Sequence, residues 1–328
     1  MIRKALKFIF FFVAPVVIVP ALLVFFGSVG MYPKPGPLPQ DTLIYIENGT
    51  PTRGIAAQLQ EKGVFTDEGR YIFLAAAKFR KSNLRAGEYE IKAYAAIKDV
   101  IELLESGKTY QRKLTVAEGL MAFEIVDLVR KADALDGVIA DMPMEGSLLP
   151  ETYAYSRGET RAQMVARMQK SMRDTIDALW PARDADLPVT TPEEALVLAS
   201  VVEKETGIAA ERARVAGVFV NRMKIGMPLQ SDPTVIYAVT EGKFKLDRPL
   251  SRKDLSMQSP YNSYLYPGLP PTPIANPGRE SMMAVLHPEK HEFLYFVADG
   301  TGGHAFAKTH EEHLRNVAQW RQVQRGSP

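Results

Sequence analysis

The chain has 328 residues, a net charge of only +2 and 46% hydrophobic residues. This length and composition predict two folded domains, and the near-neutral charge gives no reason to expect a nucleic-acid partner. The absence of cysteine excludes disulfide frameworks, thiolate metal sites and thiol nucleophiles.

The first 33 residues are typical of a membrane anchor. Arg3, Lys4 and Lys7 precede an uncharged stretch over residues 8–33, which is long enough to cross a bilayer. The positive-inside rule keeps the basic end in the cytoplasm. We therefore expect a single-pass protein of the cytoplasmic (inner) membrane whose working part is periplasmic or otherwise extracytoplasmic. A signal peptide cleaved near residues 28–30 is the alternative.

A small α+β module is predicted next. Residues 34–41 are rich in proline and glycine and indicate a short stalk. Residues 42–117 then alternate strand and helix signals, which predicts an independently folded unit. The expected strands cover 42–50, 85–94 and 110–119, and the expected helices cover 51–64, 67–81 and 96–107.

The remainder of the chain is predicted to be mainly helical. Residues 118–158 form a connecting region with a helix near 122–131, and residues 159–328 form the larger domain. Thr191, Pro192 and Glu194 make a helix start, so we expect a helix over about 192–206 that Gly207 ends. Further expected elements are helices over 210–224, from 233 onward and over 310–325, an extended proline-rich wall over 251–278, and a β-hairpin within 292–309.

Two carboxylates stand at the end of the helix predicted over 192–206. Glu203 and Glu205 lie at about 80° and about 280° around the helix from Ala195, on the two shoulders of its apolar stripe. An apolar environment raises the pKa of a carboxyl group and lets it act as a general acid. The alternative is that both are rim residues paired with Arg212 or Arg214. Helical periodicity does not choose between the two glutamates.

The proline-rich wall is a candidate sugar-binding surface. Tyr261, Asn262 and Tyr264 offer aromatic faces and an amide, which pyranose rings with acetamido groups need. Gln230 lies in a preceding loop and is a candidate ligand contact. Asp232 is a second one, although it precedes Pro233 and is also typical of a helix N-cap. An ordinary surface segment is the alternative.

Other chemistry is disfavoured. His310 and His313 do not form the HExxH zinc pattern, and we predict no metal and no cofactor. His304 follows a glycine-rich turn and favours a structural role. That turn lacks the sequence context of a phosphate-binding loop.

Five motifs in this order resemble the endolytic murein transglycosylase (YceG-like) family. They are EGSLLPETY, LASVVEKETG, VFVNRMKIGMPLQSDPTVIYAV, YNSYLYPGLPPTPIANPG and LYFVADGTGGHAF. The resemblance implies a LysM-like module next to the membrane and a catalytic domain that cuts peptidoglycan strands internally. It also implies that Glu203, the first glutamate of VEKET, is the catalytic residue, with Glu205, Thr206 and Asn221 in supporting roles.

The expected function is therefore cleavage of the MurNAc–GlcNAc bond to give 1,6-anhydro-MurNAc ends, with one glutamate as acid and then base. Glycan strands and the membrane are the expected partners, a peptidoglycan synthase is a further candidate, and nucleic acid is not expected. A glycoside hydrolase is the first alternative, using a second acid such as Glu151 or Asp232. A non-catalytic glycan-binding scaffold is the second.

Overall fold

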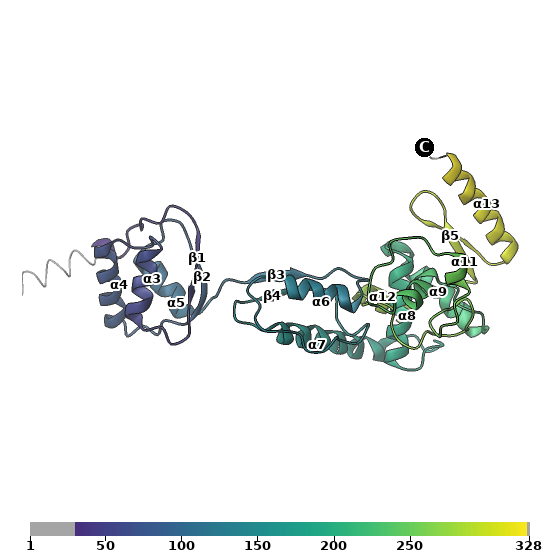
Figure 1. Cartoon of the computed structure of the whole chain (residues 1–328), viewed down its shortest axis with the longest axis horizontal. Helices are drawn as coiled ribbons and strands as arrows, with labels where there is room; N and C mark the ends of the chain where they lie inside the picture. The colour runs from purple at the N-terminus through teal and green to yellow at the C-terminus, as the bar shows by residue number, and fades with distance from the viewer. Residues whose placement is uncertain (1–29, 327–328) are drawn as a thin grey trace, which may run out of the picture. The chain divides into compact units, whose positions relative to one another are not determined.

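A computed structural model describes residues 30–326, which divide into two compact units at Arg112 and Lys113 (Figure 1). The predicted anchor over residues 1–33 falls almost entirely outside the described part. Between residues 30 and 326, no helix is long and apolar enough to cross a membrane. The anchor and the functional boundaries at residues 117 and 158 stay predictions.

The first unit is a small α+β fold, as the sequence predicts. Its elements are β1 (Thr42–Ile46), α3 (Thr52–Glu61), α4 (Asp67–Phe79), β2 (Gly87–Ile91) and α5 (Ile97–Ser106). β1 and β2 are antiparallel, with Thr42 opposite Ile91. Along β1, Ile44 and Ile46 point into the core while Tyr45 is exposed, because successive side chains of a strand face opposite sides.

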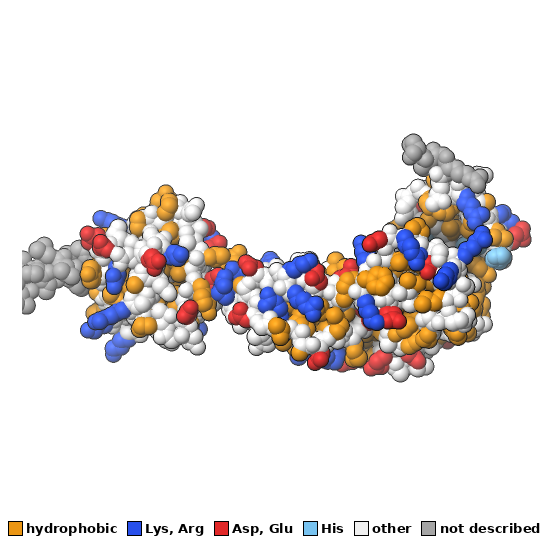
Figure 2. All heavy atoms as spheres, viewed as in Figure 1, with side chains coloured by type: hydrophobic (Ala, Val, Ile, Leu, Met, Phe, Trp, Pro, Cys, Tyr) orange, Lys and Arg blue, Asp and Glu red, His pale blue; other side chains and the backbone are white. Residues whose placement is uncertain are grey.

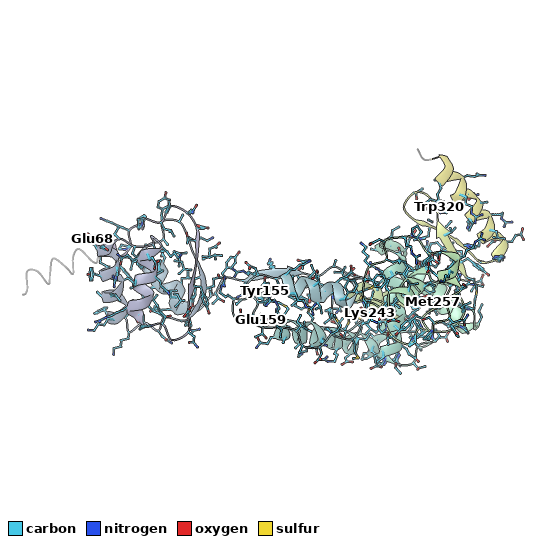
Figure 3. The ribbon with its side chains drawn as sticks, viewed as in Figure 1. Glu68, Tyr155, Glu159, Lys243, Met257 and Trp320 are labelled. Carbon is cyan, nitrogen blue, oxygen red and sulfur yellow. The ribbon has the colours of Figure 1, made fainter. Side chains whose placement is uncertain are left out.

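The second unit begins with a two-stranded sheet beside two helices. β3 (Arg112–Thr115) pairs with β4 (Thr152–Tyr155), and α6 (Ala122–Lys131) and α7 (Arg161–Leu179) pack against each other. The strand expected at the end of the first module thus pairs within the second unit. Strand alternation identifies a strand but not its partner. Tyr155, labelled in Figure 3, is buried in the core of this region.

The centre of the second unit is a helical core. α12 (Arg279–Leu286) packs against both α8 (Pro192–Glu205) and α9 (Ala209–Lys224). Leu198, Phe219 and Met282 are fully buried between them. The shorter helices around this core are η2 (Trp180–Ala182), α10 (Asp232–Thr240) and α11 (Arg252–Leu255).

The chain closes with the predicted hairpin and helix. β5 (Tyr295–Ala298) and β6 (His304–Ala307) are antiparallel, and α13 (His310–Gly326) follows. Gly300 and Gly302 have φ of 88° and 99° in the turn, a region that glycine enters without steric cost. The fold class is therefore a mostly helical α+β protein with small two-stranded sheets.

Three local predictions need correction. α8 ends because Thr206 turns extended, and Gly207 does not adopt the left-handed conformation expected of it. Ser231, not Asp232, precedes α10, and no side chain caps that helix. The proline-rich segment contains one short helix, α11, which precedes its first proline, Pro260.

Candidate active site

The site is built on the end of α8. Thr191 accepts a hydrogen bond from the backbone nitrogen of Glu194, which fixes the start of the helix. Buried residues from Ala195 to Val202 anchor its length in the core. Glu203 and Glu205 therefore leave the core on opposite sides of the last turn, and their surroundings differ.

Glu205 faces the loop before α10. The Ser231 hydroxyl donates a hydrogen bond of 2.5 Å to Glu205 Oε1. Burial raises the pKa of Glu205 to about 7, and the negative charge of Asp232 acts in the same direction. The Ser231 hydrogen bond and the charges of His304 and Arg222 act against the rise in this pKa. Near neutral pH, this carboxyl is present in both protonation states.

Hydrogen bonds connect the loop before α10 to the proline-rich wall. The Tyr264 hydroxyl donates to Asp232 Oδ1 at 2.7 Å, and burial raises the pKa of Tyr264, which keeps that hydroxyl protonated. The backbone nitrogen of Ser231 donates to Ser263 Oγ at 3.0 Å. Asp232 and Tyr264 are thereby held beside Glu205.

Gln230 occupies an unusual position in this loop. Its φ is 51°, in the left-handed region, and its side chain is exposed. Its backbone nitrogen donates to the Ser263 carbonyl at 3.0 Å. Strained backbone held by its surroundings is often found at functional sites. Gln230 thus presents an amide to solvent next to Ser231 and Asp232.

Arg222 supplies a buried positive charge to the site. Its guanidinium donates to the carbonyls of Leu294 at 2.6 Å and Leu229 at 2.5 Å, and it lies 5.3 Å from the centre of the Tyr295 ring. Burial lowers the pKa of Arg222, and the charge of Glu205 opposes that shift. Arg222 therefore joins α9 to β5 behind the Glu205 carboxyl.

Glu203 has different neighbours. Its Oε2 accepts a hydrogen bond from the Gly278 nitrogen at 2.9 Å. Arg212 Nη2 lies 4.0 Å from Glu203 Oε1 and 3.9 Å from Glu118 Oε2. Burial first, and then the charge of Glu203, raises the pKa of Glu118. Glu203 thus belongs to a separate charged cluster.

Several predicted site residues have internal partners. The amide of Asn262 is fully buried and donates to the carbonyls of Leu255 and Met257. The amide of Asn221 donates to the carbonyls of His291 and Phe293. Both amides therefore stabilise loops.

The contacts of the remaining predicted residues do not include Glu205. The Tyr261 hydroxyl hydrogen bonds to Thr272, and its ring packs on Tyr237 beside a hollow of about 380 Å³. Thr206 accepts a hydrogen bond from Ile208, which shapes the chain after α8. Glu151 is exposed at the start of β4, and within residues 30–326 no hydrogen bond or ion pair joins it to either glutamate of α8.

Sequence reasoning missed Ser231, Arg222 and Glu118. Ser231 precedes the predicted Asp232, and its link to Glu205 spans 26 positions. Arg222 lies in a predicted helix, and the sequence of that helix does not indicate that the arginine is buried. Glu118 adjoins Gly119, whose φ of 74° marks a tight turn beside Glu203. The glycine was the one local signal available.

Asn276 and Glu145 fix the segment that leads into α6. Asn276 is 0% exposed, and its side chain contacts the Leu148 nitrogen, the Leu120 carbonyl and Glu145 Oε1, each at 2.9 Å. Glu145 Oε1 also accepts from the Ala122 nitrogen. Burial raises the pKa of Glu145 to about 7.

We expect Glu145→Gln to flatten the pH dependence of stability. A raised folded-state pKa favours the native state below the unfolded value of 4.5, and this advantage is lost as pH rises through about 7. The loss is about 3 kcal/mol. Urea unfolding at pH 4.5 and pH 8 should show a smaller difference for the variant than for wild type. An unchanged difference would contradict a titrating Glu145.

The face of the protein drawn in Figure 2 carries both positive and negative side chains and is not dominated by either. In Figure 2, Lys and Arg side chains are interspersed with Asp and Glu over both units. Over residues 30–326, no group of three or more His, Asp or Glu side chains is arranged to hold a metal ion.

A carboxyl with a pKa near 7, beside exposed polar and aromatic side chains, is the arrangement of an acid–base enzyme. The chain belongs to the YceG-like family, whose pattern matches residues 44–319. It is 33% identical to the endolytic murein transglycosylase of Bacillus subtilis, covering 82% of each chain. This confirms the family and the enzyme class that the five sequence motifs predict.

Two further relatives support this assignment. The chain is 28% identical to the endolytic murein transglycosylase of Streptococcus pneumoniae, over 84% of this chain and 57% of that protein. A 2.6 Å crystal structure of a YceG-like protein from Listeria monocytogenes matches with a TM-score of 0.51 and 30% identity. That match covers 84% of this chain and 99% of the Listeria chain.

Proposed function

We propose that this protein is an endolytic peptidoglycan lytic transglycosylase. It cuts the MurNAc–GlcNAc bond within glycan strands and leaves 1,6-anhydro-MurNAc ends. The observation that carries the proposal is the carboxyl of Glu205, whose pKa burial raises to about 7 beside Ser231 and Asp232. The names of the relatives support the substrate class.

The reaction needs one titrating carboxyl. The protonated carboxyl donates its proton to the glycosidic oxygen that leaves with GlcNAc, and the bond from that oxygen to C1 of MurNAc breaks. The C6 hydroxyl of the same MurNAc attacks C1 and gives its proton to the carboxylate just formed. The carboxyl is restored, no water is consumed, and the new end carries a 1,6-anhydro ring.

We propose Glu205, rather than the Glu203 that the family motif suggested, as this carboxyl. Glu205 lies beside Asp232 and Tyr264, which are two of the predicted sugar-binding residues. A third, Gln230, directly precedes the Ser231 that binds Glu205. Glu203 accepts a backbone hydrogen bond from Gly278 and lies near Arg212. Those contacts give Glu203 a structural role.

The groups around Glu205 have distinct roles in this proposal. Tyr264 offers a ring face to a sugar while its hydroxyl holds Asp232. Gln230 presents an exposed amide for hydroxyl or acetamido groups. Arg222 provides a fixed positive charge that stabilises the Glu205 carboxylate after its proton has left. Asp232 favours the return of that proton.

The pH profile gives a test of this assignment. The protonated Glu205 is the active acid, so kcat/KM should fall as pH rises through about 7. The Ser231 hydrogen bond lowers the pKa of Glu205, so Ser231→Ala should move this fall to higher pH. The measurement is the rate of turnover on isolated peptidoglycan as a function of pH, for the wild type and for Ser231→Ala. Thr234→Ser, which keeps a hydroxyl in the first turn of α10 close to Ser231, is the control. A shift in the opposite direction in Ser231→Ala would reject Glu205.

Product analysis tests the reaction class. Mass spectrometry of digested peptidoglycan should find ends lighter by one water than reducing ends. Reducing ends would instead indicate a glycoside hydrolase, with Asp232 as its second carboxylate next to Glu205. No turnover by the purified protein would favour a glycan-binding scaffold.

We also propose that residues 1–33 anchor the protein in the cytoplasmic membrane with both folded units outside the cytoplasm. The support is the basic end followed by an uncharged stretch that is long enough to span a bilayer. Protease added to spheroplasts should degrade the two units. Protection of both units would reject this orientation. A peptidoglycan synthase as partner stays a prediction.

A further inference from the structure

A buried arginine on the side of α8 away from Glu205 lacks hydrogen-bond partners. Arg212 is 8% exposed, and its Nε is buried with no partner within residues 30–326. Its nearest carboxylate oxygens, on Glu118 and Glu203, are 3.9 Å and 4.0 Å from Nη2. These distances exceed hydrogen-bond length. An unsatisfied buried donor is destabilising and calls for an explanation.

One of the two carboxylates beside Arg212 reaches the surface. The Glu118 side chain is 43% exposed, so solvent reaches the cluster past it. A Cβ at position 278 would lie 1.8 Å from Glu118 Oε1. Glycine at 278 therefore makes the space in which the Glu118 carboxylate sits. A ligand entering past Glu118 would meet Arg212 at the base.

The charge of this cluster restricts its ligand. The charges of Glu203 and Glu280 act on Glu118, and Arg212 opposes them. Lys204 is a second cation nearby, and its Nζ donates to the Gly119 carbonyl at 3.1 Å. Carboxylates outnumber cations, so an anion is disfavoured. Arg212 requires an acceptor, and the exposed carboxylate of Glu118 requires a donor. A neutral group with both an acceptor and a donor satisfies these demands, as an amide does with its carbonyl and its N–H.

We propose that Arg212 and Glu118 form a subsite for an amide group of the glycan strand. The amide carbonyl accepts hydrogen bonds from the Arg212 guanidinium, and the amide N–H donates to Glu118. This inference rests on the proposed function, because it assumes that a peptidoglycan strand passes the end of α8. Glu203 and Glu205 stand on opposite sides of a helix roughly 10 Å wide, so the amide lies a short distance along the strand from the bond that is cut.

Two parts of peptidoglycan carry amides: the acetamido groups of the sugars and the stem peptide. Binding of soluble fragments to full-length protein carrying Glu205→Gln separates the two sources without turnover. Three fragments are needed, namely strands with stem peptides, strands freed of peptide by an amidase, and peptide-free strands that have also been de-N-acetylated. Calorimetry gives the Kd for each.

Arg212→Lys keeps the charge and removes the planar fork, and Gly278→Ala displaces Glu118 without removing a buried charge. Both should weaken binding of the intact fragment about tenfold. Arg214→Lys is the matched control, since Arg214 lies on the same helix and pairs with Glu289, and it should bind as the parent does. Circular dichroism and thermal unfolding establish that each variant is folded.

The pattern across fragments decides the outcome. A loss that disappears once the peptide is removed assigns the stem-peptide amide, and a loss that disappears only on de-N-acetylation assigns the acetamido group. An equal loss on all three fragments, or no loss with either folded variant, overturns the subsite. The wild-type protein could release no anhydro ends while binding still depends on the amide. That result would support the subsite and reject the proposed reaction.

Discussion

Glu205→Gln is expected to reduce the release of 1,6-anhydro ends by a factor of about 10²–10⁴. Glutamine keeps the shape of the side chain and an acceptor for the Ser231 hydroxyl, but it carries no transferable proton. Binding of glycan strands should persist, because the loss falls on the proton transfer. Quantifying anhydro ends by mass spectrometry, with a parallel binding measurement, checks both parts of this expectation.

Glu203→Gln is the matched variant on the same helix turn. It should lose much less activity than Glu205→Gln, and its main effect should be on stability, because it leaves Arg212 with less opposing charge. The opposite ranking, with Glu203→Gln inactive and Glu205→Gln active, would restore the assignment that the family motif implies. If both variants kept the activity of the wild type, neither glutamate of α8 would be the acid.

Asn276→Ala should destabilise the second unit by about 3–5 kcal/mol. The substitution removes three side-chain hydrogen bonds at a position that is 0% exposed and leaves the Leu148 nitrogen without that partner, while the Leu120 carbonyl keeps its bond from the Asn276 backbone nitrogen. Buried groups left unpaired cost more than the bond itself contributed. Urea unfolding monitored by circular dichroism measures the change.

Asn276→Asp is an informative companion to this variant. Aspartate keeps an acceptor for the Leu148 nitrogen but places a second carboxyl against Glu145, whose own pKa burial raises to about 7. The loss in free energy of unfolding of Asn276→Asp, relative to the wild type, should therefore be larger at pH 8 than at pH 5. A loss below about 1 kcal/mol in Asn276→Ala would show that solvent or neighbouring groups replace these bonds.

Most helices and the hairpin were predictable because their signals are local. Thr191 and Pro192 mark the start of α8, Gly107 with φ of 68° ends α5, and Gly300 and Gly302 shape the turn between β5 and β6. Each signal depends on residues within one or two turns of the chain. Such signals survive whatever the tertiary surroundings are.

Errors arose where a distant residue decides the outcome, and at Gly207, where the conformation of a direct neighbour decides it. Asp232 resembles an N-cap, but Tyr264 engages its carboxylate. Gly207 resembles a helix terminator, but Thr206 has already turned extended and bonds to Ile208. The strand at Arg112 signals its own conformation, whereas its partner, β4, begins at Thr152.

The candidate site was predictable as a region and not as a single residue. The helical wheel put Glu203 and Glu205 on two shoulders of α8, and periodicity favoured neither. What separates them is the tertiary environment, in which Ser231 and Asp232 adjoin one glutamate while Gly278 and Arg212 adjoin the other. Gln230 was predicted as a ligand contact, but its left-handed backbone could not be read from its residue type.

The bond between Asn276 and Leu120 spans 156 positions of the chain. A growing polypeptide that ends between residues 206 and 275 contains α8, both of its glutamates and the Lys204 bond to the Gly119 carbonyl, but it lacks the bonds from Asn276 to Gly119 and Leu120. Closing so long a loop is entropically costly and delays the contact during folding. The charged surroundings of Glu203 are therefore completed late, after most of the polypeptide has been synthesised, and truncated chains should lack them.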